Sequence, residues 1–111
     1  MVSKFVISRC KNREFRFALK AGNGETILIS EGYDTKDGAL NGIQSVRSHS
    51  QVDGQYEWRE TKNGDPYFVL KANNGQIIGT SEIYGSEAAR EKGAASLVRN
   101  APGAPIHDQT I

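Results

Sequence analysis

Two copies of a short polar pattern hold the side chains of this 111-residue chain that are best suited to chemistry. Each copy has a serine, a glutamate and, two places later, a tyrosine: Ser30, Glu31 and Tyr33, then Ser81, Glu82 and Tyr84. A carboxylate beside a phenol in a concave pocket suits a ligand site or an enzyme. Alternatively, the serine and glutamate bond backbone groups at a turn while the tyrosine covers the core edge. Polar groups at turns usually satisfy backbone donors, so the sequence favours this structural interpretation.

Three further reactive side chains lack the neighbours that a site requires. His49 and His107 have no second ligand at metal spacing, which favours surface histidines. Cys10 lies between Arg9 and Lys11, a basic setting that favours a reactive thiolate, although a half-buried cysteine at a strand end fits better. The glycine-rich segments open strands, whereas a phosphate-binding loop must open a helix. The sequence therefore predicts no catalytic residue, no metal and no cofactor.

An internal repeat organises the chain. A shift of 51 places aligns residues 5–50 with residues 56–101 without a gap, and fourteen of the aligned positions are identical. The identities form the motifs Phe-x-Leu-Lys-Ala-x-Asn-Gly, Ser-Glu-x-Tyr and Gly-x-x-Ser in both halves. We therefore expect two equivalent units, residues 1–53 and 54–111, within one structural domain.

Each unit has the pattern of three strands joined by tight hairpins. Phe15, Phe17 and Leu19 alternate with polar residues and predict an amphipathic strand, which recurs in the second unit. Shorter apolar runs supply a strand before it and a strand after it. Asn-Gly pairs between the runs predict type I′ turns, which need φ > 0 at both central residues; they are Asn23-Gly24, Asn63-Gly64 and Asn74-Gly75.

A helical period follows the third strand of each unit. Thr35 and Ser86 are the predicted N-caps. The apolar stripes are Ala39, Gly42, Ile43 and Val46, then Ala89, Gly93, Ala94 and Leu97. Glycine costs helix propensity, so its presence at the same place in both stripes predicts a close approach between the helix and the sheet. In the C-terminal tail, Ile106 is positioned to anchor a short edge strand.

These repeated motifs resemble those of the YegP-like family of bacterial tandem-repeat proteins, over both repeats and the linker. The resemblance implies a β-β-β-α unit that is used twice, and it brings no catalytic residue, cofactor or substrate. We predict an α+β fold in which two tandem β-β-β-α repeats form one antiparallel sheet. Both helices should pack on one face of the sheet, with a pseudo-twofold axis relating the repeats, because each repeat has one apolar face to bury.

The sheet face opposite the helices is the second candidate site. The net charge of +1 does not indicate any class of partner. Strand parity nevertheless gathers basic residues on this face, and the candidate partner-binding residues are Arg16, Lys20, Arg59, Tyr67 and Lys71. Such a face suits an anion, a nucleic acid or a second copy of the chain, although an ordinary solvated face is favoured. Sheets that bind single strands stack bases on two or three rings, so nucleic-acid binding through Tyr67 alone should be weak.

The functional prediction is a non-enzymatic binding or accessory module of unidentified partner. A lone cysteine forms no intrachain disulfide, and no apolar stretch approaches the roughly 18 residues of a membrane helix, so we expect a cytoplasmic protein. A monomer is favoured, with a homodimer as the alternative. One rival function is nucleic-acid or anion binding through the basic face, which requires a salt-dependent affinity. The other is a small enzyme at the Ser-Glu-x-Tyr turns, which requires a concave pocket there.

Overall fold

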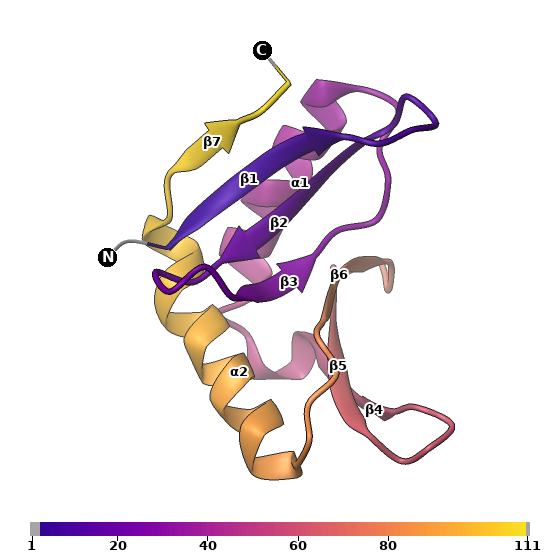
Figure 1. Ribbon diagram of the computed structural model, residues 1–111, viewed down its shortest axis with the longest axis vertical. Helices are drawn as coiled ribbons and strands as arrows, with labels where there is room; N and C mark the ends of the chain where they lie inside the picture. The colour runs from indigo at the N-terminus through magenta and orange to yellow at the C-terminus, as the bar shows by residue number, and fades with distance from the viewer. Residues whose placement is uncertain (1–2, 111) are drawn as a thin grey trace.

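The computed structural model describes residues 3–110 and has two helices packed on a single mixed sheet of seven strands, an α+β fold (Figure 1). The elements in chain order are β1 (Lys4–Arg9), β2 (Phe15–Lys20), β3 (Thr26–Ile29), α1 (Lys36–His49), η1 (Asp53–Gln55), β4 (Tyr56–Glu60), β5 (Pro66–Lys71), β6 (Ile77–Ser81), α2 (Glu87–Asn100), η2 (Ala101–Gly103) and β7 (Ile106–Asp108). Each half of the chain therefore contains three strands followed by a helix.

The two halves are joined through their third strands. The strand order is β4-β5-β6-β3-β2-β1-β7, and β3 pairs with β6 in the antiparallel sense at two positions, Leu28 with Ser81 and Ile29 with Thr80. Leu28 belongs to the core and occupies the space beside Gly79, where a Cβ atom would lie 2.5 Å from Leu28 Cδ2. Glycine at this place in β6 lets the core continue from one half into the other.

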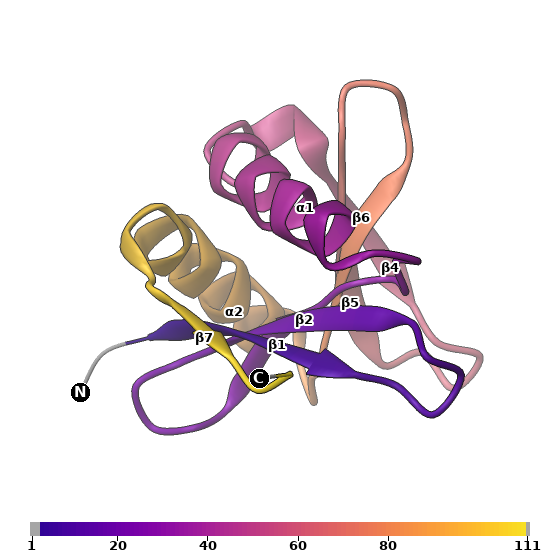
Figure 2. The same ribbon diagram turned by 90° about the horizontal axis from the view of Figure 1, so that it is seen from above.

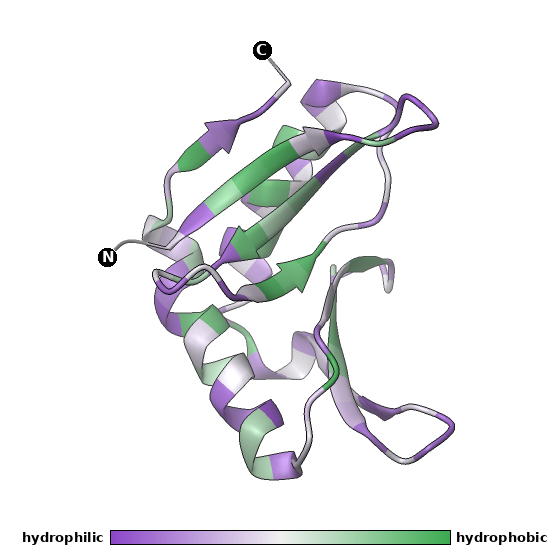
Figure 3. Cartoon of the chain, in the orientation of Figure 1, coloured by the Kyte–Doolittle hydropathy of each residue, from purple (hydrophilic) through white to green (hydrophobic). Residues whose placement is uncertain are grey.

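Both helices cover the same face of the sheet (Figure 2). Their predicted N-caps are confirmed, since the Thr35 hydroxyl accepts from the Gly38 N–H and the Ser86 hydroxyl from the Ala89 N–H. Figure 3 shows apolar residues gathered in the strands and hydrophilic residues in the hairpin loops. The core is continuous across both halves, and its largest buried side chains are Phe5, Ile7, Phe17, Leu19, Leu28, Ile43, Val46, Phe68, Leu70 and Leu97.

The hairpins have a different turn from the one predicted. In the β2–β3 hairpin, the Gly24 N–H donates to the Ala21 carbonyl, and φ is 88° at Gly24 but not positive at Asn23. The Ala21 N–H donates to the Glu25 carbonyl, which leaves three residues in the loop. A three-residue loop takes a type I turn followed by one left-handed residue, so the type I′ prediction was wrong. The other three hairpins place Arg13, Gly64 and Gly75 in the left-handed position.

The C-terminal segment makes the sheet mixed. β7 runs parallel to β1, with Phe5 opposite Ile106, so the predicted edge strand at Ile106 is confirmed. The Phe5 N–H donates to the Pro105 carbonyl at 2.8 Å, and the Gln109 N–H donates to the Ile7 carbonyl at 2.9 Å. The helix α2 ends near the start of β1, so the tail runs alongside β1 in the same direction. The prediction of an antiparallel sheet is therefore correct for six strands and wrong for the seventh.

Candidate functional site

The serines of the Ser-Glu-x-Tyr motif are hydrogen-bonded to backbone. Ser30 Oγ accepts from the Phe17 N–H at 2.9 Å and donates to the Glu31 carbonyl at 2.8 Å. Ser81 Oγ makes the same two bonds, at the same distances, with the Phe68 N–H and the carbonyl of the residue that follows. Both serines are buried. Each serine hydroxyl thus connects the end of the third strand of its half to the second strand. Its proton is already donated to a backbone carbonyl.

The tyrosines of the motif lie against the helices. Each ring stacks on the phenylalanine of the neighbouring strand, with centroids 6.1 Å apart for Tyr33 and 6.5 Å apart for Tyr84. A Cβ atom on Gly42 or Gly93 would collide with the tyrosine hydroxyl of its own half. Burial raises the pKa of both phenols, and the glutamate of the same motif raises it further. The phenols therefore stay protonated at neutral pH, and each tyrosine packs through its apolar ring and carries its hydroxyl at the end.

The glutamate and tyrosine of each copy of the motif line separate hollows. Glu82 and Tyr84 line one of about 690 Å³ that reaches across to Ile27 and the β2–β3 hairpin of the first half. Glu31 and Tyr33 line another of about 560 Å³ on the β5–β6 side of the second half. Both glutamates are exposed, and within residues 3–110 neither has an ion-pair partner. Each motif therefore faces the other half of the chain, and the two carboxylates do not share one pocket.

The open face, meaning the sheet face turned away from the helices, carries the predicted basic residues, but two of them share one carboxylate. Lys71 Nζ lies 2.8 Å from Glu57 Oε1, and Arg59 Nε contacts Glu57 Oε2. Hydrogen bonds from Lys71 and then from Arg59 hold the pKa of Glu57 below its usual value. Arg16 and Lys20 have no ion-pair partner in the described part of the chain. Lys71, Arg59 and Glu57 together keep a net charge of +1 in the second half. Arg16 and Lys20 add two positive charges, unpaired among the described residues, on β2 of the first half.

A row of mostly apolar side chains crosses the open face. The strand registers align Val6, Ala18, Ile29, Thr80 and Val69 across five neighbouring strands. Val6 and Val69 are buried, whereas Ile29 in the middle of the row is 36% exposed. Ile29 and Thr80 are also equivalent in sequence, because the shift of 51 places superimposes them. At the centre of the open face, Ile29 of the first repeat therefore pairs with Thr80, the residue at the equivalent position of the second repeat.

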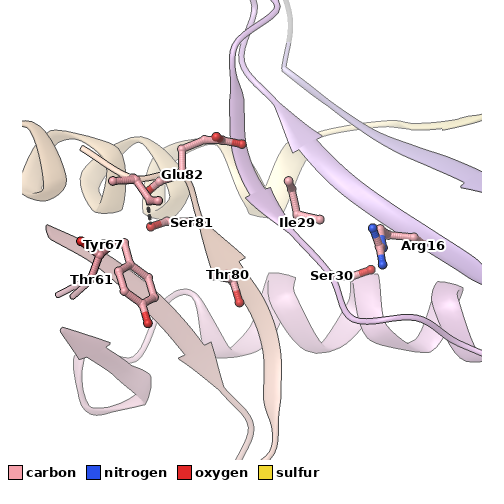
Figure 4. Close-up of a pocket in the computed structure, with 9 residues that line it drawn as sticks. Arg16, Ile29, Ser30, Thr61, Tyr67, Thr80, Ser81 and Glu82 are labelled. Atoms are coloured by element: carbon pink, nitrogen blue, oxygen red, sulfur yellow. Dashed lines mark hydrogen bonds between the residues drawn. The ribbon is translucent and has the colours of Figure 1, made fainter. Parts of the chain in front are cut away.

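A hollow of about 550 Å³ lies at this centre, and Figure 4 shows the side chains around it. Arg16 and Ile29 lie on its first-half side, and Tyr67, Thr80 and Glu82 lie on its second-half side. It forms because β3 and β6 pair at only two positions before they separate. The hollow is also lined by Ser30, Thr61, Ser81 and Ile83, of which Ile83 is 62% exposed.

Strand parity in the sequence identified Arg16 and Tyr67, which occupy equivalent positions of the repeat, as residues of the open face. It missed Ile29 and Ile83. The available signal was that Ile29 follows the core residue Leu28 and must therefore point the opposite way. Ile83 had no such signal, because it lies beyond the end of β6, where strand parity no longer applies.

Other candidate chemistry is dispersed in the part of the chain that the structure describes. No group of three His, Cys, Asp or Glu side chains there could hold a metal ion. The His49 ring Nδ1 lies 2.8 Å from the Ser45 carbonyl on α1, and His107 is exposed in β7. Cys10 is half-buried at the start of the first hairpin. None of the helices among residues 3–110 has the length and apolar character needed to cross a membrane.

Comparisons with known proteins find the repeat as well. A family described as a domain of unknown function (DUF1508) matches residues 11–59 and again residues 61–108. A UPF0339 protein of Shewanella oneidensis is 49% identical over 106 residues, which are 96% of each chain. The UPF0339 protein YegP of Escherichia coli K12 is 47% identical over 110 residues, 99% of this chain and 100% of that protein. The chain belongs to the UPF0339 family.

Solved UPF0339 structures have the same fold. The solution structure of the Shewanella oneidensis protein superimposes with a TM-score of 0.91 at 48% identity, covering 97% of this chain and 92% of that one. The solution structure of Escherichia coli YegP gives 0.92 at 47% identity, covering 98% and 94%. The resemblance to the YegP-like family is therefore confirmed. The two DUF1508 matches each run from before a second strand to the strand that follows the helix.

Proposed function

We propose that this UPF0339 protein is a non-enzymatic binding module and that its ligand occupies the hollow at the centre of the open face. The supporting observation is that Ile29 and Ile83, 36% and 62% exposed, flank one hollow. Exposed apolar surface costs free energy in water, so its concentration at a concave place favours a bound partner. The engaged serine hydroxyls and the protonated phenols of the Ser-Glu-x-Tyr motif favour binding over catalysis.

The charges around the hollow define the class of ligand. The exposed Arg16 guanidinium offers a fork of donors to one carboxylate or sulfonate group. The ring of Tyr67 and the two isoleucines suit an apolar body. Glu82 lines the same hollow and repels a second negative group. We therefore infer a small ligand with one anionic group on an apolar body, which disfavours nucleic acid with its repeated phosphates.

We further infer that the hollow lies on a pseudo-twofold axis that relates the two repeats. Two observations support this: the facing pair Ile29 and Thr80 holds equivalent positions of the repeat, and the bonds of Ser30 recur at Ser81. The protein would act as a monomer, because a homodimer formed through the open face would cover the hollow. We place it in the cytoplasm on the basis of its lone, half-buried cysteine, Cys10.

A dye titration tests the proposed function. The fluorescent probe 1-anilinonaphthalene-8-sulfonate has one sulfonate on an apolar body and is titrated into the full-length protein at neutral pH and physiological salt. We expect saturable binding with amide shifts at Ile29 and Thr80 in ¹H–¹⁵N spectra. Arg16→Ala should weaken the affinity at least fivefold. The matched control Arg99→Ala removes an exposed arginine from the last turn of α2 and should leave the affinity unchanged.

Three outcomes would contradict the proposal. They are a lack of saturable binding, equal losses in the Arg16 and Arg99 variants, and amide shifts confined to the helices. Sedimentation at twice the chain mass, reversed by Tyr67→Lys, would instead indicate that a second copy covers the open face, since the lysine would place an unpaired charge in the interface.

A further inference from the structure

The two outer edges of the sheet have different coverings. On the first half, β7 covers β1 through hydrogen bonds at both ends of the pair, from the Phe5 N–H to Pro105 and from the Gln109 N–H to Ile7. On the second half, β4 is the last strand of the sheet in the described part of the chain. The strands β1 and β4 occupy equivalent places in the two repeats. The outer strand edge that β7 covers in the first half is therefore exposed in the second half.

The backbone of β4 has the same orientation as that of β1. In the first hairpin the Cys10 N–H donates to the Glu14 carbonyl, and in the hairpin after β4 the Thr61 N–H donates to the Asp65 carbonyl. Antiparallel pairs alternate between residues that point their backbone groups inward and outward. The outward groups of β4 therefore belong to Tyr56, Trp58 and Glu60, as those of β1 belong to Phe5, Ile7 and Arg9. The Tyr56 N–H is used within the chain by the Asp53 carbonyl, which leaves the Tyr56 carbonyl and both groups of Trp58 and of Glu60.

The side chains around this edge are partly apolar and contact α2. Trp58 is 49% exposed, and the Arg90 guanidinium of α2 lies over its ring, 5.1 Å from the centroid. Arg90 also donates to the Arg59 carbonyl at 3.2 Å, and its side chain is 13% exposed. An exposed strand edge beside an exposed aromatic ring is the arrangement that accepts an added strand. Arg90 holds the tryptophan in place and has little surface left for another partner.

The charge at the start of the helix differs between the two edges. On the first half, Lys36 begins α1 and forms an ion pair with Asp108 of β7, with Nζ and Oδ2 2.9 Å apart. On the second half, Glu87 begins α2 and takes the position equivalent to Lys36. Its side chain is 79% exposed, and its nearest cation, Arg90, lies 3.9 Å away. A strand that docks on β4 as β7 docks on β1 would therefore meet a negative charge where β7 meets a positive one.

We propose that β4 binds an extended peptide segment of a partner protein as a parallel strand, in the manner of β7, with a lysine or arginine at the place of Asp108. The β7 segment of a second copy is a poor occupant, because its aspartate would face Glu87. Main-chain bonds to Tyr56 and Trp58 would supply the orientation, and the basic side chain would supply the selectivity.

Two capped hexapeptides test the proposal. One copies residues 104–109, and the other is its Asp108→Lys version; each is titrated into the full-length ¹⁵N-labelled protein. We expect the lysine peptide to bind at least fivefold more tightly and to shift the amides of β4, Trp58 above all. Equal affinities, or shifts confined to the β1 edge or to the open-face hollow, would overturn the proposal. The hollow and the β4 edge are separate surfaces, so the dye titration has its own outcome.

A charge reversal provides the second test. Glu87→Lys gives α2 the residue type that begins α1, so the variant should prefer the aspartate peptide over the lysine peptide. The control Glu91→Lys makes the same change one turn later, at another exposed position of α2, and should keep the original preference. A preference that is the same in both variants would overturn the assignment of Glu87.

Discussion

At the scale of single residues, the repeated motif fastens strands and helices together. Ser30 and Ser81 hold the backbone of β2 and β5, and each tyrosine fills the space above a helix glycine. The sequence alone favoured this structural interpretation, because polar groups at turns usually satisfy backbone donors. The sequence did not indicate that the tyrosine and the glycine belong to one contact, since eight residues lie between Tyr33 and Gly42 and only the fold brings them together.

The serine hydroxyls should contribute measurably to stability. Ser30→Ala or Ser81→Ala would leave the N–H of Phe17 or Phe68 buried without an acceptor, which costs about 1 to 3 kcal/mol. Urea denaturation followed by circular dichroism measures the change. Ser48→Ala, at an exposed position of α1, is the control and should change stability little. Equal losses at all three positions would contradict a specific role for the buried hydroxyls.

The first hairpin should be more stable with glycine at position 13 than with Arg13. Arg13 has φ of 70°, in the position that glycine takes in the other three hairpins. The left-handed conformation costs an L-residue roughly 1 to 2 kcal/mol, and the added freedom of the unfolded chain offsets part of the gain from glycine. We expect Arg13→Gly to raise the free energy of unfolding by about 0.5 kcal/mol. The reverse change at the equivalent position, Gly64→Arg, should lower it.

At the scale of elements, periodicity in the sequence predicted the strands, the N-caps and the apolar stripes, because these depend on neighbouring residues. The hairpin type was not predictable from Asn-Gly alone, since it depends on how many residues separate the paired strand ends. The direction of β7 was not predictable either, because it depends on where α2 ends relative to β1. The central hollow depends on the two-residue pairing of β3 with β6, which links residues far apart in sequence.

The helix glycines mark the contact between helices and sheet. Alanine should stabilise a helix by about 1 kcal/mol relative to glycine, yet Gly42→Ala and Gly93→Ala push a methyl group into the tyrosine hydroxyl and ring. We expect each variant to lose about 1 to 3 kcal/mol, the usual cost of overpacking. Gly85→Ala, where nothing lies within 4 Å, is the control. A helix variant that melts at or above the wild-type temperature would show that the contact is loose.

Docking of β7 should depend on pH. Hydrogen bonds from Lys36 and then from Thr110 lower the pKa of Asp108 to about 2. Because the folded pKa is below the unfolded one, the stabilisation is present above pH 4 and is lost as the pH falls towards 2. The hydrogen-exchange protection of the Phe5 amide, which bonds to Pro105, should fall in this range.

Two comparisons separate this local opening from global unfolding. The Phe68 amide in the middle of the sheet should stay protected when the Phe5 amide loses protection, and Asp108→Asn should remove the pH dependence at Phe5. If both amides lost their hydrogen-exchange protection over the same pH range, the whole protein would be unfolding and Asp108 would have no local effect.

At the scale of the whole molecule, the two halves share one core. The helix α1 contacts β2 of its own half and also β5 and β6 of the other, while α2 contacts β3. The Arg47 guanidinium donates to the Ala104 carbonyl at 2.7 Å, and the Gln51 amide donates to the Val98 carbonyl at 2.9 Å, so each helix is also connected to the opposite segment. The repeat in the sequence is therefore not a division into separately packed units.

A single half should consequently fail to fold as a monomer. In the fragment 1–53, Leu28 and the far side of α1 would be exposed. The free energy gained by burying so small a core hardly exceeds the conformational entropy that the chain loses on folding. Circular dichroism and sedimentation of this fragment at low concentration should find an unfolded chain or a dimer. A cooperative thermal transition from a monomeric fragment would show that the halves are independent.

The parallel pairing of β1 and β7 also determines how the fold responds to mechanical force. The chain enters β1 at one end of this pair and leaves β7 at the other end, so tension applied to the two ends of the chain pulls the strands past each other along their length. In this shear geometry the hydrogen bonds of the pair carry the load together, whereas an antiparallel pair loaded at one end would open one bond at a time. The bonds between β1 and β7, with the ion pair of Asp108 and Lys36 beside them, are therefore the first to resist stretching.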